Sequence, residues 1–277
     1  MTNERRIRVG CQRWAAPEWV TTAAGETVLY PRGTKPEEML PLYSKIFDTV
    51  EVDAALYGVP SVENLNNWYK QTPKDFIFSL KLPPEITHEK GLGAASFPVL
   101  DQFCSSIRIL KEKLGPVLIQ LPASFEPTRE NAENLRKFLA ILPRDLRFAI
   151  EFRDSRWLTD RTLAELEENR AALCLVEGKW IAREKFYDLI GRPMADFSYI
   201  RFMGRRDTVD SAQRHHNRDL NLKTWKTEID KIKAGEIYIY FNKYYEGLAP
   251  ASAQKLKKLL GLPVADPAGL EVQGSLF

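Results

Sequence analysis

The stretch that decides the fold is FAIEFRDSRW, residues 148–157, which begins as an apolar strand and turns polar within a few residues. Side chains alternate between the two faces of a strand. If Phe148 and Ile150 point outward, Glu151 and Arg153 share the opposite face. We therefore predict a carboxylate and a guanidinium side by side where this strand ends.

The same pattern, an apolar run followed by a polar residue and a loop, recurs along the chain. It predicts strands near residues 7–10, 49–53, 76–81, 117–120, 148–153, 173–177, 197–202 and 237–242. Amphipathic helices separate the strands, at intervals of roughly 25 to 40 residues, which is typical of an α/β (β/α)8 TIM barrel. An open doubly wound sheet is the alternative, but residues 10–13 lack the glycine-rich phosphate loop expected after its first strand. We expect a single barrel domain over residues 1–262.

Composition agrees with one globular domain. The 277 residues are 44% hydrophobic and 28% charged, and the formal net charge of +3 gives no global basic field for nucleic acid. Cys11, Cys104 and Cys174 are far apart and lack metal-ligand spacing, which favours buried free thiols in a reducing compartment. The first residues lack the apolar segment of a signal peptide, and no apolar run reaches the ~20 residues needed to cross a bilayer. We expect a soluble cytoplasmic protein with no membrane contact.

In a TIM barrel the carboxyl ends of all strands meet at one mouth, which holds the active site. Polar side chains that alternation would point into this mouth come from nearly every strand: Gln12, Glu51, Asp53, Lys81, Gln120, Glu151, Arg153, Glu177, Arg201 and Asn242. One interpretation is a ligand pocket with acids and bases. The other is an ion-pair network that satisfies itself, with Glu51 beside Lys81 and Glu151 beside Arg153.

On the first interpretation the catalytic candidates are Glu51, Asp53, Glu151 and Glu177, as acid, base or metal ligand. The substrate-binding candidates are Trp14, Tyr57, Lys81, His88, Gln120, Arg153, Trp157, Arg201 and Asn242. Their cations suit phosphate or carboxylate. Their aromatic rings suit stacking on sugars or bases, although packing of loops over the rim is the plainer reading of each ring.

No cofactor is required by this set of residues. Magnesium or manganese on the four candidate carboxylates is an alternative left open, because these metals accept oxygen ligands alone. The chain has 3 histidines, and only His88 is expected near the mouth, so a zinc cluster is not expected.

Several motifs resemble the YecE-like family of bacteria and archaea. They are Thr49–Asp53 with Tyr57, Lys81–Pro83 with Ile86–His88, Gln120–Pro122 with Ser124–Phe125, Glu151–Arg153 with Trp157, Tyr199–Phe202 with Gly204, and Tyr238–Asn242. The resemblance runs from about residue 7 to 260. It implies a TIM-barrel fold and brings no established activity.

The chain departs from the family pattern in three places. Met203 stands where a histidine is common before Gly204, and Lys243 stands where a second asparagine is common. The first-strand turn, often Thr-Ser-Gly-Trp, is residues 11–14, Cys-Gln-Arg-Trp. A mechanism that requires the histidine is therefore in doubt.

Residues 263–277 lose the pattern and predict a short flexible tail. Its last five residues, Gln273-Gly274-Ser275-Leu276-Phe277, resemble the peptide by which bacterial polymerases and repair proteins dock on the DNA sliding clamp. Leu276 and Phe277 would enter an apolar pocket while Gln273 hydrogen-bonds at its edge. Gly274 departs from the usual apolar residue, and an inert terminus is the alternative.

The sequence favours a hydrolase or lyase that acts on a phosphorylated or nucleic-acid-related substrate at the mouth. Two alternatives stay open. One is a non-catalytic ligand-binding module tethered to the sliding clamp by its tail. The other is a glycosidase-like barrel with paired carboxylates, which the cationic mouth disfavours.

Overall fold

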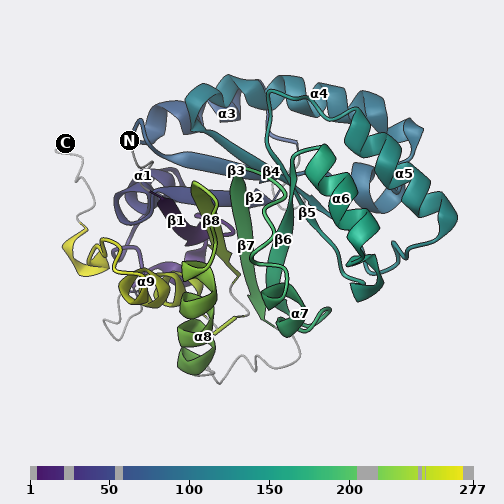
Figure 1. Cartoon of the computed structure of the whole chain (residues 1–277). Coiled ribbons are helices and arrows are strands. Elements are labelled where there is room, and N and C mark those ends of the chain that lie inside the picture. Colours follow the sequence, from purple (N-terminus) through teal and green to yellow (C-terminus); the bar gives the residue numbers. More distant parts are fainter. Residues whose placement is uncertain are drawn as a thin grey trace.

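Eight parallel strands close into a barrel in which each strand pairs with the next along the chain and β8 pairs with β1 (Figure 1). This computed structural model describes residues 5–21, 28–53, 59–204, 218–242, 245–246 and 248–270. The strands are β1 Arg6–Cys11, β2 Thr49–Asp53, β3 Ile77–Lys81, β4 Leu114–Gln120, β5 Phe148–Glu151, β6 Ala171–Gly178, β7 Phe197–Gly204 and β8 Glu236–Phe241. The predicted (β/α)8 barrel is confirmed.

Helices surround the strands on the outside of the barrel (Figure 1). They are α1 Pro36–Ile46, α3 Val62–Gln71, α4 Phe97–Ile107, α5 Arg129–Ala140, α6 Asp160–Glu168, α7 Glu184–Tyr187, α8 Asp219–Asp230 and α9 Ala249–Leu259. Capping side chains stabilise the amino-terminal ends of several of these helices. The hydroxyl of Ser61 accepts a hydrogen bond from the Asn64 amide at 3.1 Å, and Thr128 caps α5 in the same way. Each cap contributes about 1 kcal/mol.

The helix that periodicity predicts over residues 100–114 ends earlier than expected. It stops at Ile107, and a 3-10 segment (η4, Arg108–Lys113) carries the chain into β4. Gly115 and Pro116 therefore belong to the strand rather than to a helix end. A Cβ atom on Gly115 would come within 2.5 Å of the Ile77 side chain, so close strand packing explains this glycine.

The strands are buried on both faces, as parallel strands between a packed interior and a helical layer must be. Val50 and Val52 of β2 are buried on the outer face, while Glu51 lies between them in sequence and faces inward. Gly10 of β1 has no room for a side chain, because a Cβ there would lie 2.1 Å from the Thr49 carbonyl oxygen. Alternation thus directs polar side chains from several strands, among them Glu51, Glu151 and Arg201, to the barrel axis.

The segment after α9 packs against the barrel for several residues. Leu262, Ala265 and Leu270 contact the apolar core, and the Gln254 side chain donates to the Ala265 carbonyl at 2.8 Å. The sequence predicts a flexible tail from residue 263; among residues 263–270, Ala265, Pro267 and Leu270 are half-buried and the other five are exposed. Residues 271–277, which include Gln273, Leu276 and Phe277, lie outside the described residues, so clamp binding stays a prediction.

Candidate functional site

The barrel interior is filled in layers. In the layer below the mouth, the Tyr240 hydroxyl is 2.7 Å from the hydroxyl of Thr49 and 2.8 Å from that of Ser79. Above it, Arg201 of β7 lies between two carboxylates, Glu51 of β2 and Glu151 of β5. These layers close the barrel from below, so a ligand can enter only from the mouth.

Arg201 and Glu51 form a two-point ion pair. The guanidinium donates from Nε to one carboxylate oxygen at 2.9 Å and from Nη2 to the other at 2.7 Å, and the Tyr199 hydroxyl donates to the first oxygen at 2.7 Å. Burial raises the pKa of Glu51, and Arg201 and Tyr199 offset part of that rise. Burial lowers the pKa of Arg201, but Glu151 and Glu51 outweigh it and raise this pKa well above its usual value. Glu51 is 0% exposed, so it positions Arg201 rather than meeting solvent.

Glu151 bridges the buried layer and the mouth. One of its oxygens accepts from Nη1 of Arg201, and the other lies 3.4 Å from Nε of Arg153. The predicted pairing of Glu151 with Arg153 is thus confirmed. The pairing of Glu51 with Lys81 is wrong, because Glu51 binds Arg201 while Lys81 forms a 2.8 Å ion pair with Asp53 at the ends of β2 and β3.

His88 lies in a one-turn π-helix (η2, Glu85–Glu89) that follows β3. Its Nδ1 is 2.8 Å from the Thr87 hydroxyl. Burial lowers the pKa of His88, and the positive charges of Lys81 and Arg153 lower it further. His88 thus feels the charges of Lys81 and Arg153 but is not among the described lining residues of the mouth cavity, and its role in binding stays a prediction.

Three amides complete the ring at the strand ends. Nδ2 of Asn242 donates to Oε1 of Gln12 at 2.6 Å across β8 and β1, and Gln12 donates in turn to the Met203 sulfur. Gln120 is buried and donates to the Leu121 carbonyl at 2.9 Å. Gln120 is thus engaged with the backbone, whereas Asn242 borders the mouth.

The expectation that Glu177 faces the mouth is wrong. Parallel pairing puts Val176 beside Arg201 and Glu177 beside Phe202, so Glu177 is on the outer face of β6. There it accepts a hydrogen bond from the Trp225 indole of α8 at 2.8 Å and lies 3.4 Å from Arg183. The strand is apolar on both faces, and its sequence therefore could not fix which face the last residue takes.

Two predicted aromatic binding residues are packed inside the protein. Trp157 is sandwiched between Phe125 and Phe152, with ring centroids at 5.4 and 5.3 Å, and its indole donates to the Phe125 carbonyl at 2.7 Å. Trp14 meets the ring of Trp68 edge-on at 5.1 Å. Both indoles are buried, which favours a packing role for them. Tyr57 lies outside the described residues.

A cavity of about 300 Å³ opens at the mouth between β5, β6, β7 and β8. Its described lining consists of Glu151, Arg153, Val176, Gly178, Lys179, Trp180, Met203, Gly204 and Asn242. This lining contains one carboxylate and two cations. A site of this size and charge suits a small anionic ligand.

Two glycines open this cavity. Gly178 pairs with Gly204 across β6 and β7, beside an irregularity in the strand register at the end of β6. Gly204 has a φ of +63°, a conformation that favours glycine. A Cβ on Gly178 would lie 3.3 Å from Val176 and 3.5 Å from Met203, both of which line the cavity, so a larger side chain there would occupy it.

The sequence pattern did not single out Lys179 and Trp180 as site residues. They follow directly on β6, where the sequence predicts only an irregular segment with a short helix. The available signal was their place just after a strand end, which is where barrel sites draw their residues.

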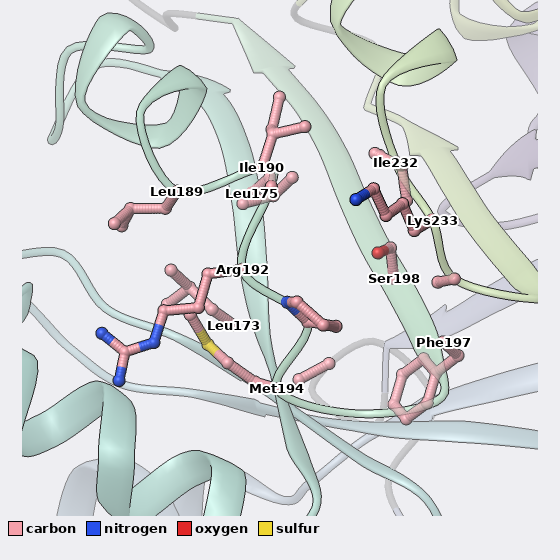
Figure 2. A pocket seen from close by; sticks show the side chains of 14 residues that line it. Leu173, Leu175, Leu189, Ile190, Arg192, Met194, Phe197, Ser198, Ile232 and Lys233 are labelled. Carbon is pink, nitrogen blue, oxygen red and sulfur yellow. The ribbon is translucent and has the colours of Figure 1, made fainter.

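Other hollows lie away from the strand carboxyl ends. Figure 2 shows one of about 30 Å³ in which Leu175, Ile190 and Phe197 lie among mostly apolar side chains. That volume has room for only about one to three water molecules. Two wider depressions, of about 400 and 650 Å³, share Arg147 and Asp196 and lie at the amino-terminal ends of the strands. Barrel chemistry takes place at the opposite end, so the mouth cavity is the candidate site.

The candidate carboxylates do not converge as metal ligands. Glu51 is held by Arg201, Asp53 by Lys81, and Glu177 by groups outside the barrel. Across the described ranges, no three His, Cys, Asp or Glu side chains form a group that could hold a metal ion. The described carboxylates therefore form no preassembled magnesium or manganese site, and a metal held by one or two of them together with a substrate phosphate stays a prediction.

The fold and the mouth together define a TIM-barrel protein with a polar cavity at the carboxyl ends of its strands. Residues 8–273 match the family described as Protein of unknown function DUF72, and the chain belongs to that family. The resemblance to the YecE-like family is confirmed by two relatives. YecE of Escherichia coli (strain K12) is 31% identical over 147 residues, which cover 53% of this chain and 48% of YecE. This chain thus spans about half the length of that relative.

The second relative, YunF of Bacillus subtilis (strain 168), is 24% identical over 258 residues, 84% of this chain and 90% of YunF. Among solved structures, a DUF72 family protein from Thermotoga maritima MSB8 is 25% identical, with a TM-score of 0.75, over 92% of this chain and 99% of its own. Another from Enterococcus faecalis V583, 24% identical with a TM-score of 0.70, shares the fold. None of these names states an activity.

In the part of the chain described above, no helix has the length and apolar character to span a membrane.

Proposed function

We propose that this protein is a hydrolase or lyase that acts on a small phosphorylated substrate, or on a nucleic-acid component that carries phosphate, in the mouth cavity. The observation that carries the proposal is the position of Glu151. Its carboxylate lines the cavity while Arg201 holds it from below and Arg153 lies at its side. A carboxylate fixed in this way is suited to proton transfer next to a bound anion.

Residues that line the cavity would perform the chemistry and bind the phosphate, and residues in the buried layer beneath would position them. Glu151 takes a proton from the attacking water, or from the substrate carbon in a lyase, and returns it to the leaving group. Arg153 and Lys179 hold the phosphate, and the Asp53–Lys81 pair extends the charged rim. Glu51 acts through Arg201, because it is buried beneath the cavity and touches no space that a substrate could occupy.

Glycoside hydrolysis needs two carboxylates on opposite sides of the scissile bond, about 5 to 9.5 Å apart. Among the described lining residues Glu151 is the single carboxylate, and cations flank it. These features favour an anionic substrate over a neutral sugar.

A screen for turnover tests the proposal. The purified protein is incubated with phosphomonoesters, phosphodiesters, nucleotides, sugar phosphates and short DNA, and its metal content is measured beforehand. Glu151→Gln should abolish any turnover found. Glu177→Gln is a matched control, because Glu177 is a similarly buried strand carboxylate on the opposite face, and this variant should keep its activity. Unchanged turnover in Glu151→Gln would refute the acid/base role.

The alternative is a non-catalytic module that holds its ligand and reaches the sliding clamp through residues 273–277. It predicts ligand binding without turnover, together with clamp binding that is lost when Leu276 and Phe277 are replaced by alanine. Turnover that depends on Glu151 would decide for the enzyme.

A further inference from the structure

Trp180 differs from every other tryptophan of the chain. The sequence contains 6 tryptophans. Trp180 is 46% exposed, whereas none of the other five exceeds 9%. An exposed indole gives up the stabilisation that burial of a large apolar side chain brings. An exposed indole at a cavity is therefore a candidate contact for a partner rather than part of the core.

The position of Trp180 links it to the anion-binding side of the mouth. It lines the same cavity as Glu151, and the guanidinium carbon of Arg153 lies 5.5 Å from the centre of its ring. The ammonium of Lys179 lies 4.3 Å from the same ring. These cation–π contacts place both charges over the ring of the indole. A phosphate that draws the two cations toward itself would therefore free the ring face for the rest of the ligand.

We propose that Trp180 is the stacking wall of the site and that the ligand is a ring joined to a phosphate, such as a nucleoside monophosphate. The inference rests on the function proposed above and names its substrate class. In this binding mode, the face of a flat or puckered ligand ring stacks on the indole, and the phosphate binds Arg153 and Lys179. Nucleotides and sugar phosphates both offer such a ring and a phosphate, and the cavity of about 300 Å³ lies in the size range of small-ligand sites.

Stacking of a base on an aromatic side chain contributes about 1–3 kcal/mol. Trp180→Ala should therefore weaken binding of adenosine monophosphate by roughly 5- to 150-fold. Trp180→Phe should restore most of the loss, because phenylalanine keeps an aromatic face. Leu220→Ala is the matched control: Leu220 of α8 is a large apolar side chain that is 77% exposed and outside the cavity lining, and its loss should leave affinity unchanged.

The experiment is a titration followed by tryptophan fluorescence, with thermal unfolding of each variant to confirm folding. The probes are adenosine monophosphate, ribose 5-phosphate, adenosine and inorganic phosphate. We expect adenosine monophosphate to quench the emission and to protect it from acrylamide. Protection by ribose 5-phosphate as well would identify the sugar face as the stacking group, and its absence would identify the base.

Two failures are distinguishable. If adenosine monophosphate binds no more tightly than inorganic phosphate, and Trp180→Ala leaves both affinities unchanged, the stacking wall is refuted while anion binding survives. If none of the phosphorylated probes binds the wild-type protein, or Arg153→Ala does not weaken their binding, the proposed function fails and this inference fails with it.

Discussion

Arg201 holds both carboxylate oxygens of Glu51, through Nε at 2.9 Å and Nη2 at 2.7 Å, and both side chains are buried inside the barrel. The two residues come from β2 and β7, on different sides of the ring. The remaining Nη1 donor of the guanidinium points at Glu151. Because Glu51 binds the guanidinium at two points, the orientation of Arg201 is fixed. Its third donor, Nη1, therefore determines where the Glu151 carboxylate lies.

Replacing Arg201 with lysine should destabilise the fold. An ammonium cannot reproduce the planar fork that binds Glu51 at two points and Glu151 at a third. Loss of a buried charged hydrogen bond should lower the free energy of unfolding by about 2–3 kcal/mol, measured by urea denaturation at neutral pH. Arg156→Lys is the control, because Arg156 makes its ion pairs in solvent, and no measurable change is expected there. Equal stability of the two variants would contradict a buried, specific pair.

The pH dependence of anion binding should report on His88. Its pKa lies below the usual 6.5 because of burial and because Lys81 and Arg153 are nearby. A bound anion offsets those positive charges and raises this pKa, so binding takes up a proton. Sulfate affinity should therefore increase as pH falls below 6.5, a range in which sulfate itself stays fully charged. His88→Asn should flatten the profile, and an unchanged slope would exclude His88 from the site.

A side chain on Gly178 should close the mouth cavity. A Cβ atom at position 178 would contact Val176 and Met203. The substitution Gly178→Val therefore puts two methyl groups into the space lined by Glu151 and Trp180. We expect titration calorimetry to detect no saturable binding of adenosine monophosphate. Gly191→Val is the control, because nothing lies within 4 Å of a Cβ there and the residue is outside the mouth. Full affinity in Gly178→Val would mean that the ligand binds elsewhere.

Trp157→Phe distinguishes packing from ligand binding. Phenylalanine keeps the stack with Phe125 and Phe152 but leaves the Phe125 carbonyl without its indole donor. An unsatisfied buried acceptor costs about 1–3 kcal/mol, which thermal unfolding should detect. Ligand affinity should not change. A variant of full stability and reduced affinity would return Trp157 to the binding site.

The barrel and most of its interior were predictable because parallel strands repeat one simple rule. An apolar run that ends in an inward polar residue identifies β2, β3, β5, β7 and β8, and alternation then places Glu51, Lys81, Glu151 and Arg201 correctly. Glu177 was misplaced because β6 is apolar on both faces, so either orientation of its last carboxylate satisfies the pattern.

The partners of the charged residues were harder to predict than their positions. Glu51 was expected beside Lys81 on the neighbouring strand, but its partner Arg201 reaches across the barrel interior, over a distance that no local sequence pattern encodes. Trp180 was missed for a related reason. The exposure of the Trp180 side chain depends on how the segment after β6 folds over the rim of the barrel. The sequence predicts only which segments are apolar.

The most direct test of the central claim, that the mouth cavity binds a phosphorylated ligand through Arg153, is the rise in melting temperature at saturating adenosine monophosphate. At 100 times the dissociation constant a ligand stabilises the fold by about 2.7 kcal/mol. We predict that rise for the wild-type protein and for Arg192→Ala, whose arginine lies on the outer wall with Asp160, and its loss in Arg153→Ala. An equal rise in Arg153→Ala, or none in the wild-type protein, would contradict the account.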